Sequence, residues 1–389
     1  MGTKARPRQV ILVLCCYCMA ANSILLVAPA LCLSALAVDL GLQSELQKGL
    51  FLSAILWGMV LTSLLSGWAA DRLGFRLLLL LSTLLQGVGL VQISLVQSPW
   101  PAIAGSFLAG LGRGMISAPL TALLCTLYPE NRTRVTGIFH AFFHIGMVAF
   151  ILLTLGLLQL GWNWRIIFQL FNGLILAYGV AALFAPLPGP STPAAAKDRQ
   201  PLWDVARQPV FVLLMAISFL TAIVEIGAGN WLPYFIELTT GASRTFSGFG
   251  LLLFAVALSV GRIAVFSLLH KWGVKPYFWV AGLVCVGSLL LAALPLGALS
   301  TTFWLAVLGL GISGVYPTLL GYAGDLFPRA GSAIFILMNS TAILGGVAGP
   351  LSIGLAADAF GLRPAMGLLA LAPLGFIVLV LLIREPPRS

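Results

Sequence analysis

Long apolar runs separated by short polar turns make up almost the whole chain. A helix needs about 20 residues to cross a hydrocarbon core. Runs of that length are predicted at 10–35, 47–69, 77–97, 101–127, 137–159, 165–187, 209–236, 247–269, 276–295, 301–322, 332–356 and 364–383. They lack the alternation of membrane β-strands, and backbone polar groups in lipid must be satisfied within each segment. The pattern predicts an all-α integral membrane protein with twelve transmembrane helices.

One polar stretch, Pro186–Pro209, stands apart from the short turns. Four prolines and a glycine fall within its first eight residues, and Lys197, Asp198 and Arg199 follow. Such a segment does not cross a membrane. We therefore expect a six-helix bundle over 1–187, a cytoplasmic linker over 188–208 and a second six-helix bundle over 209–389.

The composition excludes a soluble globular protein. Hydrophobic residues make up 60% of the chain and charged residues 8%, whereas soluble domains hold about 25% charged residues. No polar segment is long enough for a soluble domain, and no loop has a nucleophile–base or metal-ligand pattern. We therefore expect neither an enzyme nor a cofactor or metal site.

The basic residues predict the orientation of the helices. Fifteen of the 21 Lys and Arg residues fall on the side of the N-terminus, and four fall on the other: Lys48, Arg165, Arg244 and Arg363. By the positive-inside rule both termini face the cytoplasm, as in a bacterial inner membrane protein. The net charge of +10 is then explained by anionic lipid headgroups, and nucleic acid is not an expected partner.

A decapeptide at Gly67–Arg76 returns at Gly354–Arg363. Both copies read G-x-A-A-D-x-x-G-x-R, a charged turn punctuated by glycine between two apolar runs. A repeated hairpin of this kind in a membrane chain is typical of transporters built by internal duplication.

On these residues the chain resembles the major facilitator superfamily over nearly its whole length. Its most specific signature, G-x-x-x-D-R-x-G-x-R, consists here of Gly67, Asp71, Arg72, Gly74 and Arg76. The resemblance implies two six-helix bundles and solute transport by alternating access. It also implies that this turn gates the cytoplasmic side, with Asp71 contacting the dipole of a neighbouring helix terminus.

Two segments are similar to the fucose–galactose–proton symporter group within that superfamily. They are Ile138–Gly146 in the fifth span and Glu225–Leu232 in the seventh. That group carries carboxylates in its first and fourth helices for proton coupling, and this chain has none in either span.

Three ionisable residues fall at membrane depth, where each costs at least about 2.5 kcal/mol on insertion scales. They are Arg113 in the fourth span, Glu225 in the seventh and Arg262 in the eighth. Glu225, the only carboxylate well inside a span, is a candidate for proton coupling and for substrate binding. The alternative is a structural ion pair with Arg262 or Arg113. Two arginines and one glutamate leave one positive charge, which favours an anionic group in the cavity.

Further polar residues within or near the spans are candidates for substrate binding: Asn22, His140, His144, Asn230, Trp231, Tyr316 and Asn339. His140 and His144 share a helical face, a spacing compatible with a metal, but packing or a substrate hydrogen bond explains them better.

The sequence thus predicts a monomeric, proton-coupled carrier of a small polar solute, sugar-like or carboxylate-bearing. The open alternatives are a proton-antiport exporter of drugs or metabolites and an organic-anion carrier.

Overall fold

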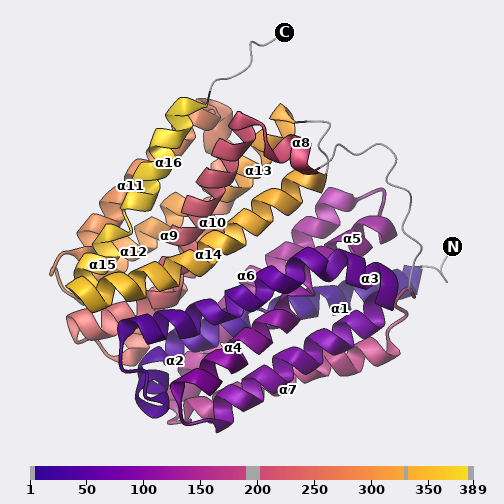
Figure 1. The fold of residues 1–389 in the computed structure, drawn as a ribbon, viewed down its shortest axis with the longest axis horizontal. Helices are drawn as coiled ribbons and strands as arrows, with labels where there is room; N and C mark the ends of the chain where they lie inside the picture. Colours follow the sequence, from indigo (N-terminus) through magenta and orange to yellow (C-terminus); the bar gives the residue numbers. More distant parts are fainter. Residues whose placement is uncertain (1–4, 190–201, 328–331, 384–389) are drawn as a thin grey trace. The chain divides into compact units, whose positions relative to one another are not determined.

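The computed structural model describes residues 5–189, 202–327 and 332–383, and every regular element in these ranges is a helix (Figure 1). Before the linker lie α1 (Ala5–Ala21), α2 (Ile24–Leu40), α3 (Glu45–Leu95), α4 (Pro99–Gly114), α5 (Ser117–Leu127), α6 (Arg132–Gln159) and α7 (Trp164–Phe184). After it lie α8 (Leu202–Ala206), α9 (Pro209–Thr240), α10 (Arg244–Trp272), α11 (Val274–Ala293), α12 (Ala298–Ile312), α13 (Val315–Leu326), α14 (Ser332–Phe360), α15 (Leu362–Leu368) and α16 (Leu371–Leu382).

Eleven helical segments of the described chain are long and apolar enough to cross a membrane. One of them is α3, which has 51 residues and contains two crossings, because Gly74 interrupts it with φ 77° and ψ 158°. Only glycine adopts such a backbone without strain. The expected all-α fold with twelve crossings is therefore confirmed.

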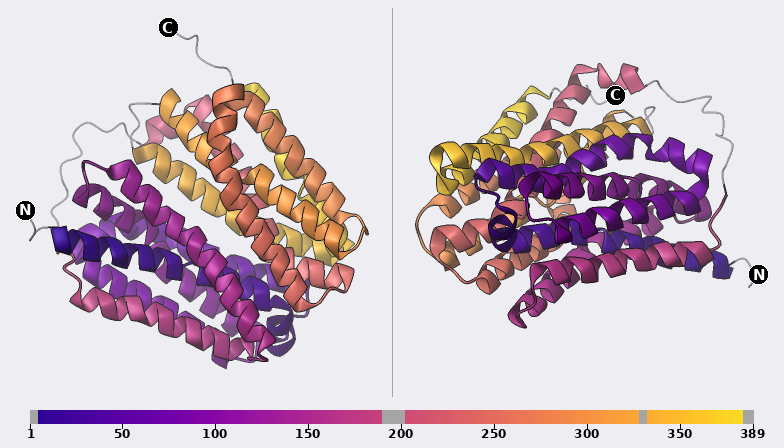
Figure 2. Two further views of the ribbon diagram at one scale, coloured as in Figure 1. Left: turned by 180° about the vertical axis from the view of Figure 1, so that it is seen from behind. Right: turned by 60° about the horizontal axis from the view of Figure 1, so that its bottom comes forward.

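The chain folds into two compact units, whose helices run side by side within each unit (Figure 2). The first unit comprises the residues up to Gln43 and those from Ala54 to the linker. The second comprises Ser44–Ser53 and the residues after the linker. The start of α3 thus belongs to the second unit, although the rest of α3 belongs to the first.

Both copies of the repeated decapeptide end on an arginine that donates a hydrogen bond to the C-terminal end of another helix in the same unit, a contact here called a clamp. Gly74 and Gly361 have positive φ, and the arginine two residues later reaches the end of another helix. Arg76 Nη2 donates to the Ala185 carbonyl at 3.0 Å. Arg363 Nη1 donates to the Leu294 carbonyl at 2.9 Å. A cation at a helix C-terminus is favoured by the helix dipole and satisfies an orphan carbonyl.

Two other turns use the same chemistry. Lys275, two residues after Gly273, donates to the carbonyl of Ile383 at 2.9 Å. Arg165 donates to the carbonyls of Ser94 and Val96 at 2.7 and 2.8 Å. A basic residue at the start of one helix therefore ties it to the C-terminal end of another at four turns.

Candidate functional site

Three of the predicted spans are broken near their middle. The breaks lie at Asn22–Ser23 between α1 and α2, at Met115–Ile116 between α4 and α5, and at Ser313–Gly314 between α12 and α13. Pro119 and Pro317 have no backbone N–H, so the carbonyls four residues earlier, in Met115 and Ser313, lose their helical donors. Ser23, Met115 and Gly314 keep right-handed helical dihedral angles, so each break is a kink in a helix that continues beyond it. Interrupted membrane helices line the binding sites of many transporters, which makes these kinks candidate sites.

Arg113 lies in the last turn of α4, beside one of these breaks, and is only 9% exposed. Its Nη1 donates to the carbonyl of Asn22, at the α1–α2 break, at 3.0 Å. Its guanidinium carbon lies 5.4 Å from the centroid of the Phe143 ring, a cation–π contact. Five ion pairs are found among the described residues, and none includes Arg113. The first unit therefore buries a cation without a protein counterion in its described part.

A hydrogen-bonded network adjoins Arg113. Ser82 Oγ donates to the Gly112 carbonyl at 2.7 Å, and Gln86 Nε2 donates to Ser82 Oγ and to the Tyr178 hydroxyl at 2.9 and 2.8 Å. Three buried side-chain oxygens of this unit have no hydrogen-bond partner within the described chain: Asn22 Oδ1, Gln86 Oε1 and Asn172 Oδ1. A buried acceptor without a donor is costly, so these oxygens favour a ligand that donates hydrogen bonds.

The two histidines of α6 lie in the same unit as Arg113. His140 is exposed, with Nε2 3.4 Å from Thr121 Oγ1. His144 packs edge-on against Phe143, the ring beneath Arg113. In the ranges that the structure describes, no group of three or more potential metal ligands occurs.

In the second unit, Glu225 on α9 pairs with Arg262 on α10. Arg262 Nη2 donates to Glu225 Oε1 at 2.9 Å. The Arg262 side chain is 28% exposed and the Glu225 side chain is 22% exposed. Arg262 Nε also donates to the Ser313 carbonyl, which Pro317 deprives of its helical donor, at 3.2 Å. Of the two partners that the sequence left open for Glu225, the structure brings Arg262 to it. The unbalanced positive charge is therefore that of Arg113.

The remaining candidates of the second unit are dispersed. Trp231 is fully buried, and its indole N–H donates to the Pro350 carbonyl at 3.1 Å, so it ties α9 to α14. Asn230 is buried, and its Nδ2 has no partner among the described residues. Tyr316 lies half-buried in the first turn of α13, next to the Ser313 break, and Asn339 is exposed on α14.

The five residues of the expected gating turn stay together around the Gly74 break of α3. Arg72 lies over the Trp68 ring at 4.7 Å, and Arg76 makes the clamp to Ala185. Asp71 is half-buried, and no hydrogen bond or ion pair of its carboxylate is found within the described ranges. Gly67 has open space around its Cα. The gating role of this turn stays a prediction.

Lys48 is buried, although on the sequence alone it is expected among the charges of a loop. The structure places it in α3 at 6% exposure, with its Nζ 2.7 Å from Glu45 Oε1. Asp358 is a second residue without an expected role, and its carboxylate accepts hydrogen bonds from the start of α3. The sequence does carry a signal for Asp358, because this residue occupies the aspartate position of the second decapeptide.

The sequence profile of the Major Facilitator Superfamily matches residues 12–343. An uncharacterised transporter of the same type from Yersinia pestis is 23% identical over 84% of this chain and 84% of its own length. A gentisate transporter of Corynebacterium glutamicum is 25% identical over 76% of this chain and 69% of its own. A bacterial homologue of the human lysosomal transporter Spinster, solved in an inward-facing and occupied conformation, has the same fold. Its TM-score is 0.80 at 14% identity over 96% of each chain.

Proposed function

This chain belongs to the Major Facilitator Superfamily and is a membrane transporter, not an enzyme, and we propose that it carries a small carboxylate-bearing solute driven by protons. The observation that carries the proposal is the buried Arg113, which has a backbone carbonyl and an aromatic ring as its partners but no acidic residue in the described chain.

The guanidinium of Arg113 suits a carboxylate in charge and in shape. One nitrogen, Nη1, is engaged by the Asn22 carbonyl, and this bond orients the group. The fork of the remaining N–H donors matches the two oxygens of a carboxylate, a pairing stronger than a bond between neutral groups. A solute that brings its own negative charge would offset the cost of burying Arg113.

The surroundings of Arg113 favour an anion that also carries hydroxyl groups. The unpartnered oxygens of Asn22, which contacts Arg113, and of Gln86, which lies next to Gly112, accept hydrogen bonds and donate none, and Phe143 adds an aromatic face. Gentisate, which the Corynebacterium relative is named for, combines an aromatic ring, a carboxylate and hydroxyl groups. Aromatic hydroxy acids are therefore the solutes that we propose to test first.

Proton coupling is assigned to the pair of Glu225 and Arg262. A proton on Glu225 would remove its charge and weaken the bond to Arg262, which also holds the Ser313 carbonyl at the α12–α13 break. Protonation of Glu225 would thereby free Arg262 to move, and so weaken its hydrogen bond to the Ser313 carbonyl between α12 and α13. A buried carboxylate that alternates between charged and neutral forms can link a proton to a conformational step.

The test is a thermal-shift titration of the purified protein, because a ligand that binds the native state raises the melting temperature by mass action. The panel holds an aromatic hydroxy acid, an aliphatic dicarboxylate, a neutral sugar and a lipophilic cation. We expect the acids alone to stabilise the protein. In Arg113→Gln their apparent affinity should fall by about tenfold or more, as for the loss of a hydrogen bond to a charged group.

The matched control is Arg8→Gln, which removes one positive charge from the exposed pair with Glu130. It should leave the titration unchanged, which excludes a general effect of net charge. Stabilisation by the sugar or the lipophilic cation alone, or an undiminished response of Arg113→Gln to the acids, would contradict the proposal.

A further inference from the structure

The first turns of α3 belong to the second unit, while the rest of the helix belongs to the first. Residues 44–53, here called the docking segment, are grouped with α9 and α14. The approach to α14 is close at the backbone level. A Cβ on Gly354 would lie 2.6 Å from the Glu45 carbonyl oxygen, and one on Gly49 would lie 2.7 Å from the Pro350 carbonyl oxygen. No larger residue fits at either glycine without separating the two helices.

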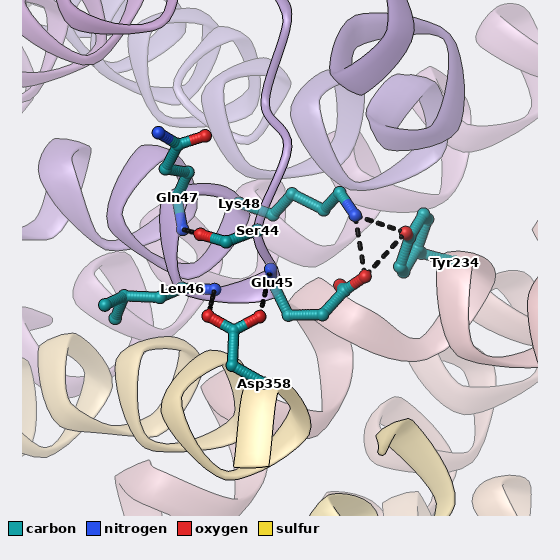
Figure 3. Close-up of polar contacts among 7 residues, drawn as sticks. All are labelled: Ser44, Glu45, Leu46, Gln47, Lys48, Tyr234 and Asp358. Atoms are coloured by element: carbon teal, nitrogen blue, oxygen red, sulfur yellow. Dashed lines mark hydrogen bonds and ion pairs between the residues drawn. The ribbon is translucent and has the colours of Figure 1, made fainter. Parts of the chain in front are cut away.

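The carboxylate of Asp358, in the last turn of α14, points at the N-terminus of α3 (Figure 3). Its Oδ1 accepts from the Glu45 N–H at 2.6 Å, and its Oδ2 accepts from the Leu46 N–H at 3.0 Å. The first N–H groups of a helix have no partner within the helix, and the dipole favours a negative charge there. Asp358 therefore caps the N-terminus of α3, which begins 313 residues earlier in the sequence.

A second contact joins the docking segment to α9. Lys48 Nζ lies 2.7 Å from Glu45 Oε1 and 2.6 Å from the Tyr234 hydroxyl, and Glu45 Oε1 also accepts from that hydroxyl at 3.1 Å (Figure 3). Both charges of this cluster stand on α3, one helical turn apart. If the segment leaves α9, Lys48 and Glu45 leave as a pair, and Tyr234 loses its hydrogen bonds and its cation–π contact with Lys48. Detachment thus strands no charge on α9, which is the condition for a contact that forms and breaks repeatedly.

Asp358 occupies in the second decapeptide the position that Asp71 occupies in the first. The resemblance assigned a charge–dipole contact to Asp71, yet the structure shows one at Asp358. We propose that Asp358 is a gating residue, which holds the docking segment on the second unit in one state of the transport cycle and releases it in the other. This proposal rests on the chain being an alternating-access transporter, but not on its solute or coupling ion.

Hydrogen–deuterium exchange of the full-length protein in lipid nanodiscs, without added solute, tests the proposal. In Asp358→Ala, exchange in the peptide covering 44–53 should become at least about tenfold faster, because two charge-assisted bonds to its amides are lost. Asp358→Asn, which keeps the shape but not the charge, should give an intermediate rate. The peptide covering 67–76, around Asp71, should exchange more slowly, because the released protein populates the opposite state.

Asp325→Asn is the matched control, since it removes one exposed carboxylate from α13 in the same unit and should alter neither peptide. If the cap has a merely structural role, exchange in the peptide covering 44–53 becomes faster, while exchange in the peptide covering 67–76 stays as in the wild type. That result would overturn the proposal. Unchanged exchange at 44–53 would overturn it as well. Melting temperatures within a few degrees of the wild type confirm that the variants are folded, and neither readout depends on whether carboxylates are the solute.

Discussion

Arg113 and Arg262 show how one residue type takes two roles through its neighbours. Each donates to a backbone carbonyl at a break in a membrane helix, Asn22 for the first and Ser313 for the second. Arg262 also has Glu225, whereas Arg113 has no carboxylate in the described part of the chain. The paired arginine suits a protonation switch, and the unpaired one suits an anionic solute. The difference lies in a single carboxylate.

The role of Glu225 leads to a prediction for Glu225→Gln, which imitates the protonated form permanently. Reconstituted in proteoliposomes, the variant should lose proton-driven accumulation of solute completely. It should keep exchange of solute down its own gradient within about twofold, because the solute cycle needs no proton. The measurement is uptake with and without an imposed pH gradient, and Glu237→Gln on the same helix serves as the control.

The competing structural role predicts a different result for the same variant. If Glu225 only neutralises Arg262, the substitution should lower the free energy of unfolding. The loss is about 3–5 kcal/mol for a fully buried pair and smaller here, because both side chains are partly exposed. Transport defects would then follow stability. Normal accumulation in Glu225→Gln would remove this residue from the coupling mechanism.

At the scale of helices, the fold relies on close backbone approach and on basic clamps at helix ends. In the first unit, a Cβ on Gly110 of α4 would collide with the Ile55 carbonyl oxygen of α3. Interfaces between membrane helices are enriched in small residues, because dispersion and not hydrophobic burial holds helices together in lipid. The hydrogen bonds of Arg76 and Arg363 tie such packed helices together at their ends, Arg76 at the end of α7 and Arg363 at the end of α11.

The α3–α4 contact predicts that Gly110→Ala destabilises the protein by about 1–3 kcal/mol, the usual cost of overpacking. Gly173→Ala on α7 is the matched control, since a Cβ there meets nothing within 4 Å. It should be neutral, or stabilising by up to about 1 kcal/mol through helix propensity. Thermal or denaturant unfolding in detergent measures both, and equal stability of the two variants would disprove the tight contact.

At the scale of the whole molecule, transport requires two states, and the two decapeptides are candidates for setting their balance. The first copy holds Asp71 beside the Gly74 break of α3, and the second holds Asp358 at the end of α14. By the predicted topology these turns lie on opposite sides of the membrane. A contact on one side would then favour the state in which that side is closed.

Asp71→Asn should accordingly shift the protein toward the inward-open state and slow transport several-fold, with folding intact. Its effect on the exchange of residues 44–53 should be opposite in sign to that of Asp358→Asn. Transport rate and melting temperature are measured together, and Asp204→Asn on α8 controls for the lost charge. A wild-type rate in Asp71→Asn would mean that this aspartate has no part in gating.

The sequence by itself determined the twelve crossings, the internal repeat, the superfamily and the three ionisable groups at membrane depth, Arg113, Glu225 and Arg262. The crossings and the ionisable groups follow from the lipid solvent, which requires about 20 apolar residues per helix and makes each charge within a span stand out. The repeat and the superfamily follow from the two matching decapeptides. Such requirements act on one segment at a time, so the order of residues is enough to reveal them.

Only the tertiary structure decided which groups meet. Whether Glu225 pairs with Arg262 or Arg113 depends on which helices are neighbours, and hydropathy carries no information on that. The burial of Lys48, counted from sequence as a loop charge, and the capping of α3 by Asp358 depend on contacts more than 180 residues apart along the chain. Pairing in space separates Arg262, which has a protein carboxylate as its partner, from Arg113, which has none in the described part of the chain.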